Sequence, residues 1–116
     1  MFEPHKLEVY RIALGLLSEL DEIAAQVPPG KAALRDQLER AGTSIVLNIA
    51  EGAGEFSLAE KQRFYRIARR SGTEVVAILD IFELRNLVAT DLLATARRNL
   101  TSVISMLTKL ATMERG

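Results

Sequence analysis

Polar side chains recur at helical spacing in two stretches of the chain, and their types could support two kinds of chemistry. The first stretch, residues 40–54, reads RAGTSIVLNIAEGAG, and the second, residues 61–74, reads KQRFYRIARRSGTE. Arginine and lysine bind phosphate, whereas amide, hydroxyl and carboxylate groups on facing helices can bind one another. The first chemistry would recognise nucleic acid, and the second would fix the register of two packed helices.

The candidate residues fall into a network set and a phosphate-binding set. The network set lies beside apolar stripes, where an unpaired buried polar group would cost about 1–3 kcal/mol. Its members are Arg40, Ser44, Asn48, Glu51, Ser71 and Glu74, and Arg66 and Arg69 could join them. The phosphate-binding set is Lys61, Arg63, Arg66, Arg69, Arg70, Arg97 and Arg98. A ligand or catalytic pocket is a weaker alternative for the first set. Ordinary solvated positions, or pairs with Glu60, Glu74 or a neighbouring subunit's acidic first helix, are the alternative for the second.

Catalysis has little support in these residues. The chain has no cysteine, and its single histidine, His5, lies in the first helical turn, far from the other candidates. A nucleophile with an adjacent base is therefore missing, as is the Glu-x-x-His pattern of di-iron bundles. We expect no catalytic residue, no metal site and no cofactor.

Length and composition indicate one soluble globular domain. The chain has 116 residues, 48% of them hydrophobic, and a formal net charge of zero, so the totals do not suggest a dedicated nucleic-acid binder. Charge is nevertheless uneven, because the first helix is acidic and the first half of the third is basic. No apolar run is long enough to span a bilayer, and the first ten residues lack the apolar segment of a signal peptide. We expect a cytoplasmic protein without membrane contact.

Periodicity predicts four helices that position the candidates. They are expected from about Pro4 or His5 to Val27, Lys31 to Glu51, Ser57 to Leu87, and Thr90 to about Met113. The first helix has two apolar stripes, so it lies either between two helices of its own chain or partly against another subunit. In the fourth helix, apolar residues recur at alternating spacings of three and four and form a coiled-coil-like seam: Leu93, Ala96, Leu100, Val103, Leu107 and Leu110. Short connections favour an all-α, antiparallel up-down-up-down four-helix bundle over residues 1–116.

Glycine and capping residues give more detailed predictions. Gly52 and Gly54 are expected to end the second helix through the left-handed conformation. Ser57 is expected to cap the third helix in a capping box with Glu60, and Thr90 to cap the fourth. The third helix is expected to bury a stripe that includes Phe64, Ile67 and Ser71. Gly42 in the second helix and the Ser71-Gly72 pair in the third have small or no side chains, so each helix is thin at that point. These two thin places are expected to face each other.

The two polar stretches resemble the signature of the bacterial four-helix-bundle family encoded in 23S rRNA intervening sequences, often labelled S23 ribosomal protein. The resemblance runs from HKLEVYRIAL in the first helix to about Leu87 and rests on R-A-x-x-S-I-x-x-N-I-A-E-G followed by R-F-x-R-I-A-R-x-S-x-x-E. Two departures are Val46-Leu47, where the family often has a proline, and Glu55, where a basic residue is common.

The resemblance implies an antiparallel four-helix bundle that assembles as a homopentamer. Related proteins of diversity-generating retroelements share the fold, bind nucleic acid and bind a reverse transcriptase. The partners implied for this chain are therefore further copies of itself, with RNA or DNA and a reverse transcriptase or another protein as further candidates. Position by position, the signature carries over to Arg40, Ser44, Asn48, Glu51, Gly52, Phe64, Arg66, Ala68, Arg69, Ser71 and Glu74.

Overall fold

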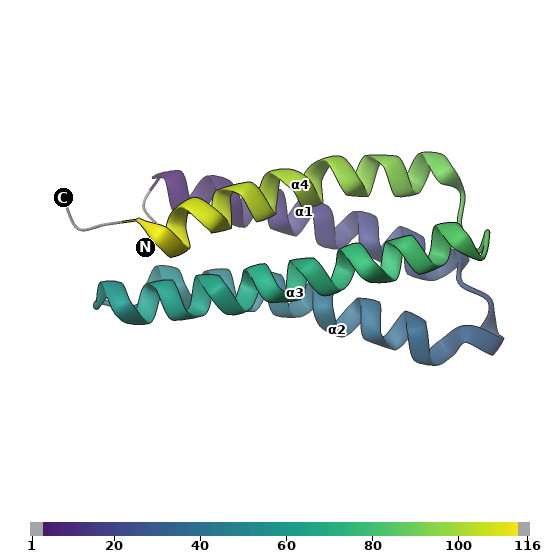
Figure 1. Cartoon of the computed structure of the whole chain (residues 1–116), viewed down its shortest axis with the longest axis horizontal. Coiled ribbons are helices and arrows are strands. Elements are labelled where there is room, and N and C mark those ends of the chain that lie inside the picture. The colour runs from purple at the N-terminus through teal and green to yellow at the C-terminus, as the bar shows by residue number, and fades with distance from the viewer. Residues whose placement is uncertain (1–3, 114–116) are drawn as a thin grey trace.

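Four long helices make up the part of the chain that the computed structural model describes, residues 4–113, with side chains described from residue 8 onward. The helices are α1 (Pro4–Gln26), α2 (Ala32–Gly54), α3 (Leu58–Leu84) and α4 (Thr90–Thr112), and a short 3₁₀ turn, η1 (Pro29–Lys31), precedes α2. Consecutive helices run in opposite directions, as Figure 1 shows. The predicted all-α, antiparallel four-helix bundle is confirmed.

The bundle is elongated, 48 × 23 × 22 Å, and each helix packs against two others. α1 and α3 each pack against α2 and α4, while within the described residues α1 and α3 lie diagonally across the core and are not neighbouring helices. The α2–α3 turn lies at the same end of the bundle as the start of α1 and the end of α4 (Figure 1). The acidic helix α1 and the helix whose first half is basic, α3, therefore occupy opposite corners of the bundle.

Apolar side chains at helical spacing form one continuous core. The predicted seam of α4 is buried along its whole length. The buried side chains of α1 are Val9, Ala13, Leu16, Leu20, Ile23 and Ala24, and Val27 directly after the helix is buried as well. The prediction for the first half of α3 was wrong by one position. Tyr65, Ala68 and Gly72 are buried, whereas Phe64, Ile67 and Ser71 are half-buried. One residue is a step of about 100° around a helix, so this shift turns the predicted stripe from the core toward the edge facing α2.

Helix ends differ from the prediction at three places, one of which is that α3 ends at Leu84 rather than at about Leu87. α2 continues through Gly52 and Gly54, neither of which has a positive φ, and Glu55 is its extended C-cap. Gly52 serves close packing instead, because a Cβ there would lie 2.6 Å from Cε1 of Tyr65. The N-cap of α4 is Ala89 rather than Thr90, without a side-chain bond. Third-helix capping is confirmed in part, since Ser57 Oγ accepts from the Glu60 N–H at 3.0 Å while the Glu60 carboxylate binds Arg63.

The thin places of α2 and α3 do not face each other. A Cβ at Gly42 would meet Leu17 and Leu20 of α1, and one at Gly72 would meet Ile104 of α4. Each glycine therefore admits a side chain from a different neighbouring helix. None of the described helices is long and apolar enough to cross a membrane.

Candidate functional site

Three arginines form an exposed basic cluster on the first half of α3. Arg66, Arg69 and Arg70 border one shallow depression together with Thr73, and all four side chains are exposed. None of the three guanidinium groups forms an ion pair with a described residue. We call these three arginines the basic face.

The sequence places this face outward for a simple reason. Tyr65, Ala68 and Gly72 turn one side of α3 into the core, so the positions between them point to solvent. Arg66 and Arg70 are four residues apart and lie one above the other on the helix surface. The face therefore presents positive charge along roughly one helical turn. Glu74 lies four residues beyond Arg70 on the same helix, but it forms no ion pair with these arginines in the described structure.

Lys61 and Arg63, the first two members of the predicted phosphate-binding set, are engaged elsewhere. The Lys61 ammonium donates to the carbonyl oxygens of Gly52 and Ala53, at 3.4 and 3.3 Å, and so caps the C-terminus of α2. Arg63 donates to the Glu60 carboxylate at 2.8 Å. That hydrogen bond, together with the negative charge of Glu60, raises the pKa of the Arg63 guanidinium. Its guanidinium also lies 4.4 Å from the centre of the Phe64 ring.

The cations of α4 lie further along the bundle. Arg97 forms ion pairs with Asp80 at 2.9 Å and Glu83 at 2.8 Å, which join α4 to α3. Arg98 is exposed and donates to Thr95 in its own helix at 3.3 Å. Of the seven predicted phosphate-binding residues, Arg66, Arg69 and Arg70 are therefore brought together.

The predicted network exists between Ser44, Asn48 and Ser71. The Ser44 and Ser71 hydroxyls are 2.8 Å apart and join α2 to α3. The Asn48 amide donates to the Ser44 carbonyl at 2.8 Å and to its hydroxyl at 3.0 Å. These half-buried groups satisfy one another along the outer edge of the α2–α3 contact, as expected for a network that fixes register.

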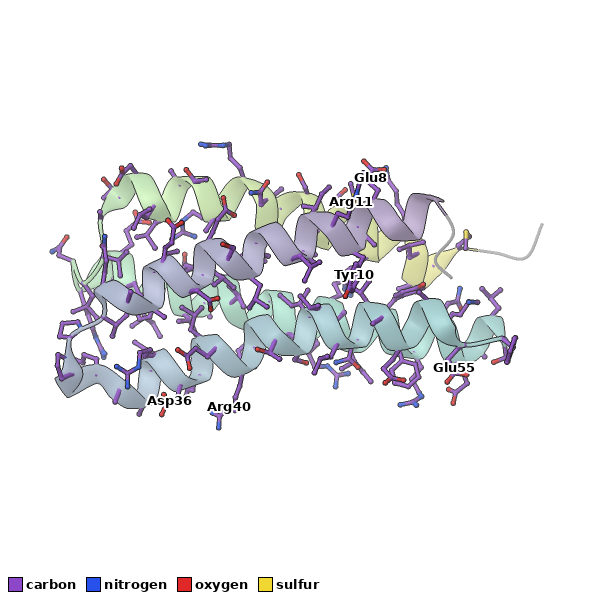
Figure 2. The ribbon with its side chains drawn as sticks, turned by 180° about the vertical axis from the view of Figure 1, so that it is seen from behind. Glu8, Tyr10, Arg11, Asp36, Arg40 and Glu55 are labelled. Atoms are coloured by element: carbon purple, nitrogen blue, oxygen red, sulfur yellow. The ribbon has the colours of Figure 1, made fainter. Side chains whose placement is uncertain are left out.

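Arg40, Glu51 and Glu74 lie outside this network. All three side chains are exposed, and none forms a hydrogen bond or an ion pair within the described residues. Arg40 extends from α2 away from the bundle, as Figure 2 shows. The reason is helical geometry: residues 40 and 51 share the outermost face of α2 with Leu47, whereas Ser44 and Asn48 are turned toward α3. The prediction that these three residues form hydrogen bonds or ion pairs inside the bundle was wrong.

Nothing among the described residues forms a metal-binding group: no three His, Cys, Asp or Glu side chains are placed to hold an ion there. His5, which was expected in the first helical turn, is not among the residues whose side chains the structure describes. The outer face of α2 around Arg40, Thr43 and Leu47 is a broad open surface rather than an enclosed cavity. The candidate residues of α2 and α3 that the structure describes therefore lie on open surfaces.

Sequence reasoning missed Phe56. Its side chain is 100% exposed at the turn between α2 and α3, at the end of the bundle from which the basic face extends. The available signal was a phenylalanine between Glu55 and the N-cap Ser57, in a turn where polar residues are usual. Sequence reasoning also did not predict that the Lys61 ammonium reaches back to the end of α2, because spacing alone does not reveal this contact.

Comparison with known proteins places the chain in a family. The model of the 23S rRNA-intervening sequence protein family matches residues 5–109. The match covers all four helices except the last turn of α4 and agrees with the four-helix bundle. A search among curated proteins finds no match.

Proposed function

The chain belongs to the 23S rRNA-intervening sequence protein family, and we propose that it is a non-enzymatic, homo-oligomeric module that binds nucleic acid through the basic face of α3. The observation that carries the proposal is the grouping of Arg66, Arg69 and Arg70, exposed and free of acidic partners in the described structure. Arginine binds phosphate oxygens in bidentate geometry, and release of counterions from the nucleic acid drives such binding.

The chain's zero net charge makes the distribution of charge decisive. Lys61, Arg63 and Arg97 are tied to groups of the protein itself. Among the described cations of α3 and α4 without an ion pair, the three arginines of the basic face lie together, whereas Arg85, Arg98 and Lys109 lie apart from them. A single cluster of three arginines would bind weakly. Several copies in one assembly would bind the same strand more tightly through effective concentration.

Filter binding to structured RNA and duplex DNA across a salt series tests this function. We expect binding near 50 mM salt that weakens as salt rises. Arg66→Gln combined with Arg70→Gln should abolish it, whereas Arg40→Gln, an exposed arginine on the outer face of α2, should have little effect. Absence of binding at low salt, or binding without a salt dependence, contradicts the proposal.

Homo-oligomerisation is the second part of the proposal, and the pentamer is proposed on the resemblance alone. The positions of α1 and α3 support assembly of a particular kind. Asp21 and Glu22 are exposed on α1, while the basic face lies on α3 at the opposite corner of the bundle. Surfaces of opposite charge on opposite sides of one subunit suit head-to-tail contacts, which close into rings when the rotation permits.

This placement also favours a second candidate function, a protein-interaction scaffold that does not bind nucleic acid. Here the basic face would contact the acidic α1 of the next subunit. Arg66→Glu with Arg70→Glu should then dissociate the oligomer in light scattering, and Asp21→Arg with Glu22→Arg should restore it. An oligomer that survives the first pair of changes while losing nucleic-acid binding would leave the scaffold without support.

A further inference from the structure

Phe56 is the most exposed large apolar side chain of the described residues. Its side chain is 100% exposed, compared with 81% for Leu84 and 58% for Leu47. Burying a phenylalanine side chain stabilises a protein by about 1.5–3 kcal/mol, and the bundle gains none of this from Phe56. Such a side chain suits a contact with something other than its own chain.

The backbone on both sides of Phe56 is held in place. The Glu55 N–H donates to the Gly52 carbonyl at 3.3 Å, and the Lys61 N–H donates to the Ser57 carbonyl at 3.0 Å. Lys61 further joins the end of α2 to the start of α3 through its ammonium group. The ring is therefore presented on a fixed turn, which lowers the entropic cost of using it in a contact.

The first two turns of α3, which carry the Glu60–Arg63 pair, separate this turn from the basic face. Arg66 and Arg70 lie 9 and 13 residues beyond the N-cap Ser57, which corresponds to about 13 and 20 Å along α3. A strand whose phosphates lie along these arginines would bring its next few nucleotides to the end of the bundle, where Phe56 projects. Every base has a planar face that stacks on an aromatic ring, so such a contact needs no particular sequence.

We propose that the nucleic acid bound by the basic face is single-stranded and that Phe56 stacks on one of its unpaired bases. This proposal rests on the proposed function and adds the ligand class. In a duplex the bases are paired and stacked, and extracting one costs a few kcal/mol, so duplex DNA would use the arginines without the ring. Single-stranded ligands gain from both.

The chain has no tryptophan, so Phe56→Trp introduces a single fluorescent reporter at this position. Titration with oligothymidine of about 12 nucleotides should quench its fluorescence, and added salt should reverse the quenching. A duplex containing the same strand should quench it far less. Leu84→Trp, on an exposed side chain at the other end of α3, is the matched control and should remain unquenched.

Two further variants separate stacking from general apolarity. Phe56→Leu keeps an apolar side chain and Phe56→Ala removes it, yet each should weaken oligothymidine binding about tenfold, since both lose the ring. Duplex binding should be unchanged in both. Because Phe56 makes no core contact, neither variant should lower the melting temperature.

The outcomes are distinct. Oligothymidine binding that is salt-dependent but equal in wild type, Phe56→Leu and Phe56→Ala would overturn the stacking proposal and leave the proposed function standing. A reporter whose emission shifts with protein concentration before any oligonucleotide is added would show that position 56 contacts another subunit, and that too would overturn it. Failure of wild type to bind oligothymidine, duplex and structured RNA alike would remove the proposed function and this inference together.

Discussion

At the scale of single residues, Gly52 shows how one missing side chain allows two helices to meet. Tyr65 of α3 is 1% exposed, and its ring lies where a Cβ of residue 52 would be. The absence of a side chain at this point lets the end of α2 lie directly on the aromatic ring. The residue that was expected to break the helix instead packs within it.

Gly52→Ala should therefore lower the free energy of unfolding by about 1–2 kcal/mol. Alanine has the higher helix propensity by up to about 1 kcal/mol, but the buried ring has little room to move away. The matched control is Gly54→Ala, two residues later in the same helix, where a Cβ would meet no atom within 4 Å. Urea unfolding should show Gly54→Ala unchanged or slightly more stable. Equal effects at the two glycines would mean that the Tyr65 ring shifts freely.

Lys61 gives a second prediction at this scale. Its ammonium group compensates the carbonyl oxygens left without partners at the end of α2. Lys61→Met keeps most of the aliphatic stem and removes the charge, so stability should fall by about 0.5–1.5 kcal/mol. Lys109→Met, on an exposed lysine of α4, should change it by less than about 0.5 kcal/mol. A thermal melt of Lys61→Met that matches wild type would mean that the contacts with the Gly52 and Ala53 carbonyls do not stabilise the fold.

At the scale of helices, the contact between α2 and α3 combines an apolar interior with a polar outer edge. The Ser44–Ser71 bond lies along that edge, and Asn48 supports it from the same helix as Ser44. A slip of either helix by one residue would separate the two hydroxyls. The bond is therefore suited to selecting one register.

A double-mutant cycle measures this contribution. Ser44→Ala and Ser71→Ala should each reduce stability, with a coupling energy of about 0.5–1 kcal/mol, the usual net value of a hydrogen bond. Glu51→Ala, on the exposed face of the same helix, should cost less than about 0.5 kcal/mol. Purely additive effects at the two serines would indicate that water replaces the bond at no cost. A large effect at Glu51 would instead indicate a partner in another subunit.

These helices also mark how far sequence reasoning extends. The seam of α4 was predicted correctly because its apolar positions allow only one face. In α3 two aromatic residues are adjacent, Phe64 and Tyr65, and apolarity alone does not decide which one is buried. The polar signature was harder still, since Ser44 and Glu51 both match the family pattern while only Ser44 is turned toward α3. A pattern identifies positions on a helix, whereas the angle of each neighbouring helix decides which ones find partners.

At the scale of the whole molecule, a chain without net charge carries a cluster of cations on the first half of α3 and an excess of acids on α1, the helix at the opposite corner. Polyanion binding and self-association would both draw on this asymmetry. If the basic face were buried in contacts between subunits, it could not bind phosphates. If it remained open, each subunit of an oligomer would offer one face to the same strand.

The salt dependence of the binding constant shows how many basic faces contact one strand. Each phosphate neutralised on a single strand contributes about −0.7 to the slope of log K against log salt, so one face of Arg66, Arg69 and Arg70 should give a slope of about −2. Two faces engaged by one long strand should give about −4. Arg70→Gln should reduce the slope by about 0.7 for each face in contact, whereas Arg85→Gln, at the far end of α3, should leave it unchanged. Measurements with short and long oligothymidine would then differ if several subunits bind one strand. A slope that is the same for both lengths means that a single face acts alone.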